Sequence, residues 1–168
     1  MHDLKRHIID VPDFPKPGIV FRDISPLLRN HFSATTAALS GLVSNDEWSR
    51  IDALAGIESR GFVLAAALAT LHNKGFVMAR KFGKLPPPTT RESYDLEYGT
   101  DELEMKPGNG RILLVDDVLA TGGTMRAAAN LCAGAGYELQ GLLVLIDLKL
   151  TSDFVWSSLR VRSVIRYD

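Results

Sequence analysis

The chain has 168 residues, enough for one domain with a substantial hydrophobic core and too few for two comfortable ones. Hydrophobic residues make up 46% and charged residues 23%, as in ordinary soluble proteins, and the net charge of −1 argues against a nucleic-acid or anionic-membrane partner. No apolar run is long enough to span a bilayer, and charged residues near the N-terminus interrupt any signal-peptide core. A lone cysteine, Cys132, cannot form an internal disulfide, so we expect a cytoplasmic protein.

The N-terminal region, residues 1–30, is expected to form an ordered arm. Its first ten or so positions are polar with a few apolar residues, which favours a short helix. Prolines then exclude regular structure and favour an extended segment: Pro12, Pro15 and Pro17. Residues 21–26 mix apolar and charged side chains. They fit either a capped loop packed on the core or a lid that brings Phe21 and backbone amides over a ligand.

Hydrophobic spacing predicts alternating helices and strands in the rest of the chain. Residues 31–43 have the spacing of an amphipathic helix, 44–50 form a polar connection, and 62–71 are apolar nearly all round, as in a buried helix. Short apolar runs predict strands at 52–57, 76–79, 112–115, 142–146 and 161–165. This alternation predicts a single α/β domain over residues 1–168, with a doubly wound, mostly parallel sheet flanked by helices.

Residues 86–105 form a long segment that opens with three consecutive prolines and alternates poorly. We interpret it as a flexible β-type loop. A connection of this length inside a compact domain is usually functional or disordered.

Residues 112–124 combine a buried strand, two carboxylates and a loop of small residues before a helix. Gly122 and Gly123 allow a tight turn with converging N–H groups, and the dipole of the following helix favours an anion. Asp116 and Asp117 cannot bind phosphate, so they would accept hydrogen bonds from sugar hydroxyls or face a cation. The pattern therefore indicates a phosphorylated sugar. The alternative is an ordinary turn in which a threonine caps the helix.

Two other predicted strand ends carry polar groups, and ligands of such sheets bind beyond the carboxyl ends of the strands. Residues 58–61 precede a helix and offer a second anion site, with Arg60 as a forked donor. Arg80, Lys81 and Lys84 could neutralise a highly charged group, although a charged run can also be a solvated face. Cys132 lies on the apolar side of its helix and is interpreted as core filler rather than a nucleophile.

The stretch at 112–124 resembles the phosphoribosyl pyrophosphate (PRPP) signature of type I phosphoribosyltransferases. PRPP needs a 5-phosphate site, a diol site and a diphosphate site: residues 116–124 would supply the first two, and the other two strand ends would supply the third. Displacing its diphosphate passes through an oxocarbenium-like centre, so the leaving group must be held and neutralised and water excluded. The loop at 86–105 would close over the site, with Glu97 handling the proton of the base, unless Glu97 is simply an exposed loop acid.

Three further stretches resemble the adenine-specific members of that family. Residues 12–26 resemble their N-terminal hood, 56–62 their pyrophosphate loop, and 80–99 their basic strand end and flexible loop. The resemblance implies two small-molecule substrates, PRPP and adenine, Mg²⁺ bound with PRPP rather than by the protein, and a homodimer. It implies no nucleic-acid or membrane partner.

The resemblance also implies roles for individual residues. Glu97 would be the general acid or base. PRPP and AMP would be bound by Asp116, Asp117, Ala120, Thr121, Gly122, Gly123 and Thr124. Pyrophosphate would meet Glu58, Ser59, Arg60, Arg80, Lys81 and Lys84, some of them from a dimer partner. Adenine would be read by backbone groups of Val20 and Arg22 and held between the side chains of Phe21 and Val118.

The chain departs from the family pattern in the flexible loop. It is several residues shorter than usual between Met105 and Lys106, and it carries an atypical proline triplet at 86–88 and Ala79 beside Arg80. These departures concern loop closure more than identity. Two alternatives to an adenine enzyme stay open: the same reaction on another purine, or a non-catalytic PRPP or purine sensor. Neither a P-loop nor a dinucleotide-binding glycine motif is present in a suitable context.

Overall fold

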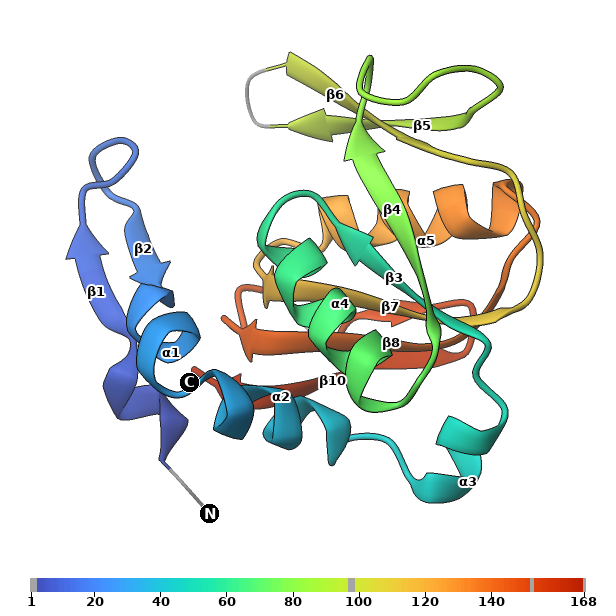
Figure 1. Ribbon diagram of the computed structural model, residues 1–168. Coiled ribbons are helices and arrows are strands. Elements are labelled where there is room, and N and C mark those ends of the chain that lie inside the picture. Colours follow the sequence, from blue (N-terminus) through green and yellow to red (C-terminus); the bar gives the residue numbers. More distant parts are fainter. Residues whose placement is uncertain (1–2, 97–98, 152, 168) are drawn as a thin grey trace.

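A computed structural model describes residues 3–96, 99–151 and 153–167 (Figure 1). Its main sheet has eight strands in the order β5-β6-β4-β3-β7-β8-β10-β9. The central strands run parallel: β4 (Gly75–Lys81), β3 (Ala53–Ile57), β7 (Arg111–Leu119), β8 (Glu138–Asp147) and β10 (Leu159–Arg166). Antiparallel strands close both edges: β5 (Thr90–Leu96), β6 (Gly99–Met105) and β9 (Val155–Trp156). The predicted mostly parallel α/β sheet is confirmed.

Helices cover both faces of the sheet, which gives three layers (Figure 1). On one face α2 (Phe32–Ser40) and α4 (Arg60–Leu71) share a core with Leu113 and Val115 of β7. On the other face α5 (Gly123–Gly134) packs against Ile112 and Leu114. Successive residues of β7 thus enter different cores, which explains its uninterrupted apolar run. No helix among the described residues combines the length and apolar character needed to cross a membrane.

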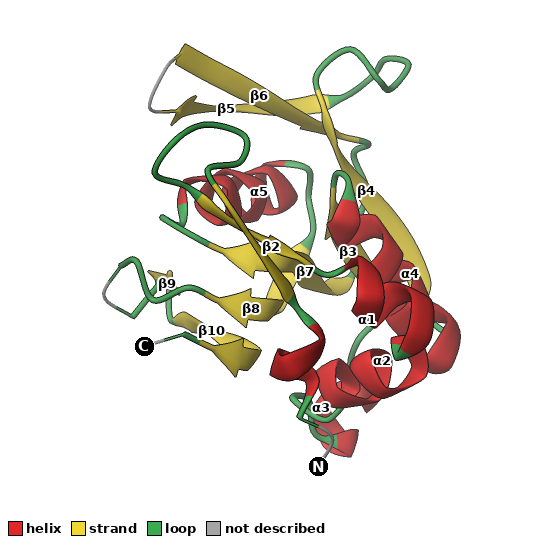
Figure 2. Ribbon diagram, turned by 90° about the vertical axis from the view of Figure 1, so that its left-hand side faces the viewer, coloured by secondary structure: helices red, strands yellow, loops and turns green. Residues whose placement is uncertain are grey.

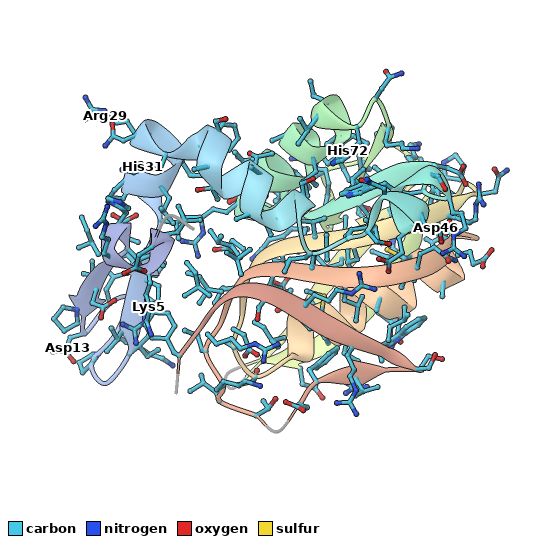
Figure 3. The ribbon with its side chains drawn as sticks, turned by 90° about the horizontal axis from the view of Figure 1, so that it is seen from below. Lys5, Asp13, Arg29, His31, Asp46 and His72 are labelled. Carbon is cyan, nitrogen blue, oxygen red and sulfur yellow. The ribbon has the colours of Figure 1, made fainter. Side chains whose placement is uncertain are left out.

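The N-terminal residues form a hairpin that stands beside the main sheet. A short 3₁₀ helix, η1 (Leu4–His7), leads into β1 (Ile9–Pro12), which pairs antiparallel with β2 (Val20–Asp23). Figure 2 shows β2 in front of the sheet, and Figure 3 shows Asp13 near the tip of the hairpin. The prediction of an arm without regular structure was wrong. Asp13 Oδ1 accepts a hydrogen bond from the Gly18 amide at 2.8 Å, and this closes the turn that contains the later prolines.

The hairpin is braced by the C-terminal end of the described chain. The ring of Tyr167 lies 4.1 Å from the Arg22 guanidinium carbon and 4.2 Å from Lys5 Nζ. Arg22 also forms an ion pair with Asp10. Burial raises the pKa of the Tyr167 hydroxyl, which keeps the ring neutral between the two cations.

Two helices were not predicted. Residues 25–30 form α1 (Ser25–Asn30), which begins with a proline in its first turn, where a proline is tolerated. The polar segment at 44–50 is not a loop: it contains α3 (Asn45–Ser49). Ser44 and Glu47 form a capping box there, in which each side chain bonds to the other's backbone N–H. The spacing of these two residues is the sequence signal for this helix.

Candidate active site

The acidic pair lies within β7, where it is buried. Asp116 is 8% exposed and Asp117 is 6% exposed. We expected the strand to end before them, but β7 continues to Leu119 because it stays paired with β8 as far as Asp147. Burial, and then the charge of Asp117, raise the pKa of Asp116 well above its ordinary value. Asp117 instead forms an ion pair with Arg60 at 2.7 Å, so the two acids are not equivalent.

The start of α4 is pressed against this acidic pair. A Cβ atom added to Gly61 would lie 2.9 Å from Asp116 Oδ1 and 2.9 Å from the carbonyl oxygen of Val115. Only a glycine permits this approach. It places Arg60, the first residue of α4, within reach of Asp117.

The loop after β7 is a turn that ends in a helix N-terminus. Gly122 has a φ of 88°, which favours glycine, and α5 begins at the next residue. The first amides of a helix have no partner within the helix, so those of α5 are available to an anion. A cavity of about 140 Å³ adjoins them and is lined by Asp116, Val118, Leu119, Ala120, Thr121, Gly122, Gly123, Thr124 and Met125. Asp116 and the loop, both predicted to hold a sugar phosphate, therefore share one cavity, whereas Asp117 does not line it and instead contacts Arg60.

A larger cleft of about 740 Å³ lies between this loop and the N-terminal hairpin. The hairpin contributes Lys16, Gly18, Ile19, Val20 and Arg22, and the loop contributes Ala120, Thr121, Gly123 and Thr124. Tyr94 and Asp95 of β5 and Leu148 and Leu150 beyond β8 complete its wall. Its mixed apolar and backbone lining suits a flat, polar-edged molecule.

Arg60 joins the acidic pair to the hairpin. Its Nη2 atom contacts Asp117, its Nη1 atom donates to the carbonyl oxygen of Arg22 at 3.4 Å, and its guanidinium carbon lies 4.9 Å from the centre of the Phe21 ring. The side chain of Arg22 is engaged elsewhere, with Asp10 and Tyr167, so its backbone is the part that faces Arg60. Neither of the two side chains predicted to hold adenine lines the larger cleft: Phe21 lies against Arg60, and Val118 lines the small cavity and packs partly on the core.

The predicted basic residues lie at the edge formed by β4 and β6, and neither cavity includes them. Glu58 Oε2 accepts hydrogen bonds from Arg80 Nε at 3.2 Å and from the Lys81 amide at 2.9 Å. Its carboxylate is thus committed to orienting Arg80. The Lys81 ammonium forms an ion pair with Asp101 at 3.1 Å. We expected these cations to meet pyrophosphate together with Arg60, some of them from a dimer partner; within this chain Arg80 and Lys81 are paired with Glu58 and Asp101.

Comparison with known proteins agrees with this geometry. Residues 28–161 match the family described as phosphoribosyl transferase domain. Adenine phosphoribosyltransferase of Hydrogenovibrio crunogenus is 54% identical over 99% of this chain and 98% of its own length. The chain belongs to the adenine phosphoribosyltransferase family.

Solved structures of the adenine phosphoribosyltransferase family share the fold over nearly the whole chain. The Saccharomyces cerevisiae enzyme, solved with adenine and D-2,5-dideoxy-2,5-imino-altritol 1,6-bisphosphate, has a TM-score of 0.88 at 32% identity and covers 96% of each chain. The Giardia lamblia enzyme, solved with 9-deazaadenine, has a TM-score of 0.87 at 35% identity, covering 99% of this chain and 97% of its own. The resemblance that the sequence motifs indicated is confirmed.

Within this phosphoribosyltransferase fold the β5–β6 hairpin corresponds to the predicted β-type loop. Glu97, the predicted acid or base, lies outside the described residues. Tyr94, which sequence reasoning did not select, lines the cleft and donates from its hydroxyl to Asp101 at 3.1 Å. Burial raises the pKa of Tyr94, as does the nearby Asp101 charge, so its hydroxyl stays a donor.

Glu104 is a second residue that sequence reasoning missed. It is 1% exposed, and its Oε1 atom accepts hydrogen bonds from the amides of Lys84 and Leu85, both at 2.7 Å. Burial raises its pKa, but the amide donors outweigh this and lower it overall. Glu104 therefore fixes the turn that carries Lys84. An acid between two apolar strand residues, Leu103 and Met105, was the available signal.

Proposed function

We propose that this member of the adenine phosphoribosyltransferase family transfers the 5-phosphoribosyl group of PRPP to adenine, giving AMP and pyrophosphate. In this reaction the bond between ribose C1 and the diphosphate oxygen breaks, a bond from C1 to adenine N9 forms, and N9 loses its proton. The observation that carries the proposal is the position of Arg60. It contacts the buried acid Asp117, at the corner between β7 and α5, and also the N-terminal hairpin that lines the larger cleft.

The sugar phosphate would occupy the small cavity. The amides and hydroxyls of residues 120–124 would bind the 5-phosphate, helped by the dipole of α5. Asp116 and Asp117 would accept hydrogen bonds from the ribose hydroxyls. Because both are buried, those bonds would form away from competing water, where they are stronger.

Adenine would lie in the larger cleft against β2. Within the described sheet β2 pairs only with β1, so its other edge keeps backbone donors and acceptors for a ligand. The exocyclic amine of adenine needs an acceptor and its N1 needs a donor, and the backbone at Val20 and Arg22 would supply them. Phe21 would stack on one face of the adenine ring, and Val118, which lines the proposed sugar-phosphate cavity, would contact the opposite face. A 6-oxopurine presents the opposite pattern and would leave these groups unpaired.

Pyrophosphate would be held by Arg60 and the Glu58–Ser59 peptide, with Arg80, Lys81 and Lys84 supplying further positive charge. Among the described residues no cluster of three or more metal-ligating side chains exists, so a divalent cation would take most of its ligands from PRPP and water. Mg²⁺ bound in this way would neutralise charge on the departing diphosphate. The protein's own part would be to orient that group and exclude water.

Proton handling is assigned to Glu97, which falls between β5 and β6 in the sequence and lies outside the described residues. Tyr94 and Asp95 of the same hairpin line the cleft, which puts this lid beside the proposed adenine site. Closure of the lid would bring the acid to the base and shield the reacting carbon from water.

The protein is further proposed to be a single-domain, cytoplasmic homodimer. Exposed apolar side chains gather on α4 and at β4, next to the basic sheet edge: Val63, Leu71, Phe76, Met78 and Phe82. The rings of Phe62 and Phe76 meet edge to face and link the two elements. A second copy on this face would cover the apolar patch and could bring its own Arg80 and Lys81 toward the neighbouring site. Light scattering should give twice the chain mass, and Phe76→Asp should shift it toward one chain; a monomeric wild type would refute the dimer.

The activity is tested by incubating the protein with PRPP and Mg²⁺ and, separately, with adenine, hypoxanthine, guanine and xanthine. We expect nucleotide from adenine alone. Product only from a 6-oxopurine would contradict the hairpin assignment and favour a different purine. Tight PRPP binding without turnover on any base would contradict catalysis and favour a sensor.

A further inference from the structure

The turn at Gly122, just before α5, packs against an aromatic side chain from a distant part of the chain. Phe154 is 9% exposed and belongs to the core cluster that includes α5. A Cβ atom added to Gly122 would lie 2.6 Å from Cδ2 of the Phe154 ring. The ring therefore rests directly against the Gly122 backbone, where no other residue type would fit.

Phe154 also contacts the first turn of the following helix. The guanidinium carbon of Arg126 lies 5.0 Å from the centre of the Phe154 ring, a cation–π distance. One ring thus touches the residue before α5 and a side chain of its first turn, so it fixes the angle at which the loop enters the helix.

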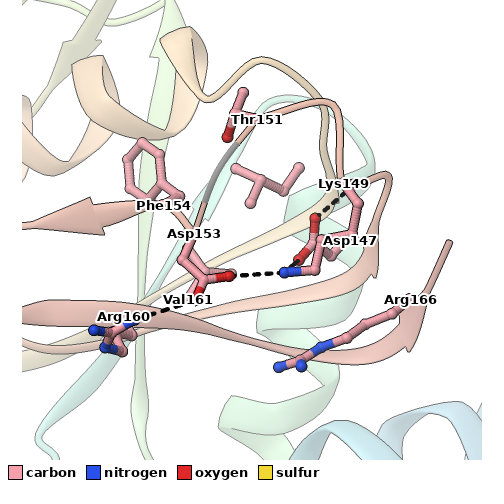
Figure 4. Close-up of a pocket in the computed structure, with 9 residues that line it drawn as sticks. Asp147, Lys149, Thr151, Asp153, Phe154, Arg160, Val161 and Arg166 are labelled. Carbon is pink, nitrogen blue, oxygen red and sulfur yellow. Dashed lines mark hydrogen bonds and ion pairs between the residues drawn. The ribbon is translucent and has the colours of Figure 1, made fainter. Parts of the chain in front are cut away.

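A chain of ion pairs holds the segment that carries Phe154 (Figure 4). Lys149 Nζ lies 2.9 Å from Asp153 and 3.5 Å from Asp147, and Arg160 of β10 pairs with Asp153 at 3.3 Å. Asp147 ends β8 and also accepts a hydrogen bond from the Lys149 amide at 2.9 Å. In Figure 4 the Phe154 ring points away from these charges. The segment is anchored on β8 and β10 while its ring meets the loop.

We propose that Phe154 is a positioning residue for the 5-phosphate of PRPP, acting through the Gly122 turn. The proposal rests on the function proposed above. A phosphate site made of backbone amides works only if the peptides are held in one orientation. Glycine at positive φ has the least intrinsic restraint of any residue, so the restraint must come from a neighbour. The Phe154 ring is that neighbour, and no residue of the signature stretch itself provides it.

The test compares Phe154→Ala and Phe154→Leu with the wild type in two measurements. Steady-state kinetics give KM for PRPP and for adenine, and calorimetry gives binding of ribose 5-phosphate and of adenine. For Phe154→Ala we expect KM for PRPP and Kd for ribose 5-phosphate to rise about tenfold or more, with the adenine values within about twofold. Phe154→Leu keeps apolar bulk and should recover much of the loss.

A double-mutant cycle with Gly122→Ala tests the contact itself. In the wild-type background the added methyl group meets the ring, whereas in Phe154→Ala only the backbone strain at position 122 remains. We therefore expect the double variant to lose less ribose 5-phosphate affinity than the sum of the two single losses. Additive losses would show that the two residues act separately and would overturn the proposal.

Trp48→Leu is the matched control, because Trp48 is also buried but stacks on His72 away from the cleft. It should lower thermal stability without changing ribose 5-phosphate affinity. The proposal fails if Phe154→Ala behaves like this control, if it weakens adenine and ribose 5-phosphate equally, or if the wild type does not bind ribose 5-phosphate. Because that titration needs no turnover, a selective loss in Phe154→Ala would support the positioning role even if the wild type made no AMP.

Discussion

The β7–α5 corner and the β4–β6 edge both gather charged groups for one proposed substrate, but they are built in different ways. At the corner, neighbouring residues of one stretch, 116–124, bring the buried acid Asp116 and the backbone of the loop to a single cavity. At the edge, two of the cations are held by carboxylates from other parts of the chain: Arg80 by Glu58 and Lys81 by Asp101. The corner is thus arranged mainly by the backbone of one stretch, together with the Arg60–Asp117 ion pair, whereas the edge is arranged by ion pairs between residues far apart in the sequence.

The largest expected effect is at the corner. Asp117→Ala removes the partner of Arg60 and leaves that cation without its buried carboxylate. We expect kcat/KM for PRPP to fall by about a hundredfold or more, because the substitution removes both a proposed acceptor for the ribose hydroxyls and the ion pair that orients Arg60. Asp52→Ala is the control, because its ion pair with Arg111 is exposed and outside both cavities. Equal losses in the two variants would contradict a special role for the corner.

Gly61→Ala tests how tightly the corner is packed. The new methyl group would lie 2.9 Å from both Asp116 and the Val115 carbonyl, so α4 would have to move. We expect a loss of about 1–3 kcal/mol in the free energy of unfolding, measured with urea, together with weaker PRPP binding. Gly41→Ala, where the nearest atoms lie at 3.5 and 3.6 Å, should change neither quantity much. A fully stable, active Gly61→Ala enzyme would mean that α4 can move away from β7 without cost, contrary to this prediction.

Glu104→Gln probes the edge, where we expect a smaller effect. The amide side chain keeps an acceptor for Lys84 and Leu85 but loses the charge. Hydrogen bonds to a charged group contribute about 1.5–3 kcal/mol and neutral ones about 1, so KM for PRPP should rise by about threefold to tenfold.

The same substitution has a pH signature. The folded-state pKa of Glu104 is depressed, so its carboxylate contributes stability above the ordinary glutamate pKa and loses it as pH falls through the folded value. The stability difference between wild type and Glu104→Gln should therefore be full near neutral pH and shrink in acid. A difference that grows toward low pH would contradict the assignment.

Cys132→Ala should have the smallest effect on activity. The thiol is buried on α5, and burial raises its pKa to about 12, so it is not a nucleophile at neutral pH. We expect kcat and KM to stay within about twofold and thermal stability to fall slightly from the lost volume. A severe catalytic loss with the fold preserved would contradict its role as core filler.

The contrast between the two regions also explains what the sequence could reveal. The corner was predicted because its chemistry is local: strand, acids, glycines and helix follow one another within residues 112–134. The C-terminal end of β7 was predicted too early. The strand continues because it stays paired with β8, and the acidic residues themselves give no sign of that pairing.

Contacts between residues far apart in the chain could mostly not be predicted from the sequence. Glu104 and Phe154 act on Lys84 and Gly122, and nothing near either residue identifies its partner. The hairpin strands were missed because prolines usually argue against pairing, whereas here β1 ends at Pro12 and the other two prolines lie in its turn. By contrast α3 could have been found, since Ser44 and Glu47 have capping-box spacing.

Tyr167 connects the segment after β10 to the N-terminal hairpin, which is the proposed adenine-binding element. Its ring lies between Lys5 and Arg22, and Arg22 is the residue whose carbonyl meets Arg60. Loss of the Tyr167 ring, or an insertion beside it, would disturb these contacts and with them the support of the N-terminal hairpin. Fusions intended for kinetic work should therefore be separated from Tyr167 by a flexible, removable linker.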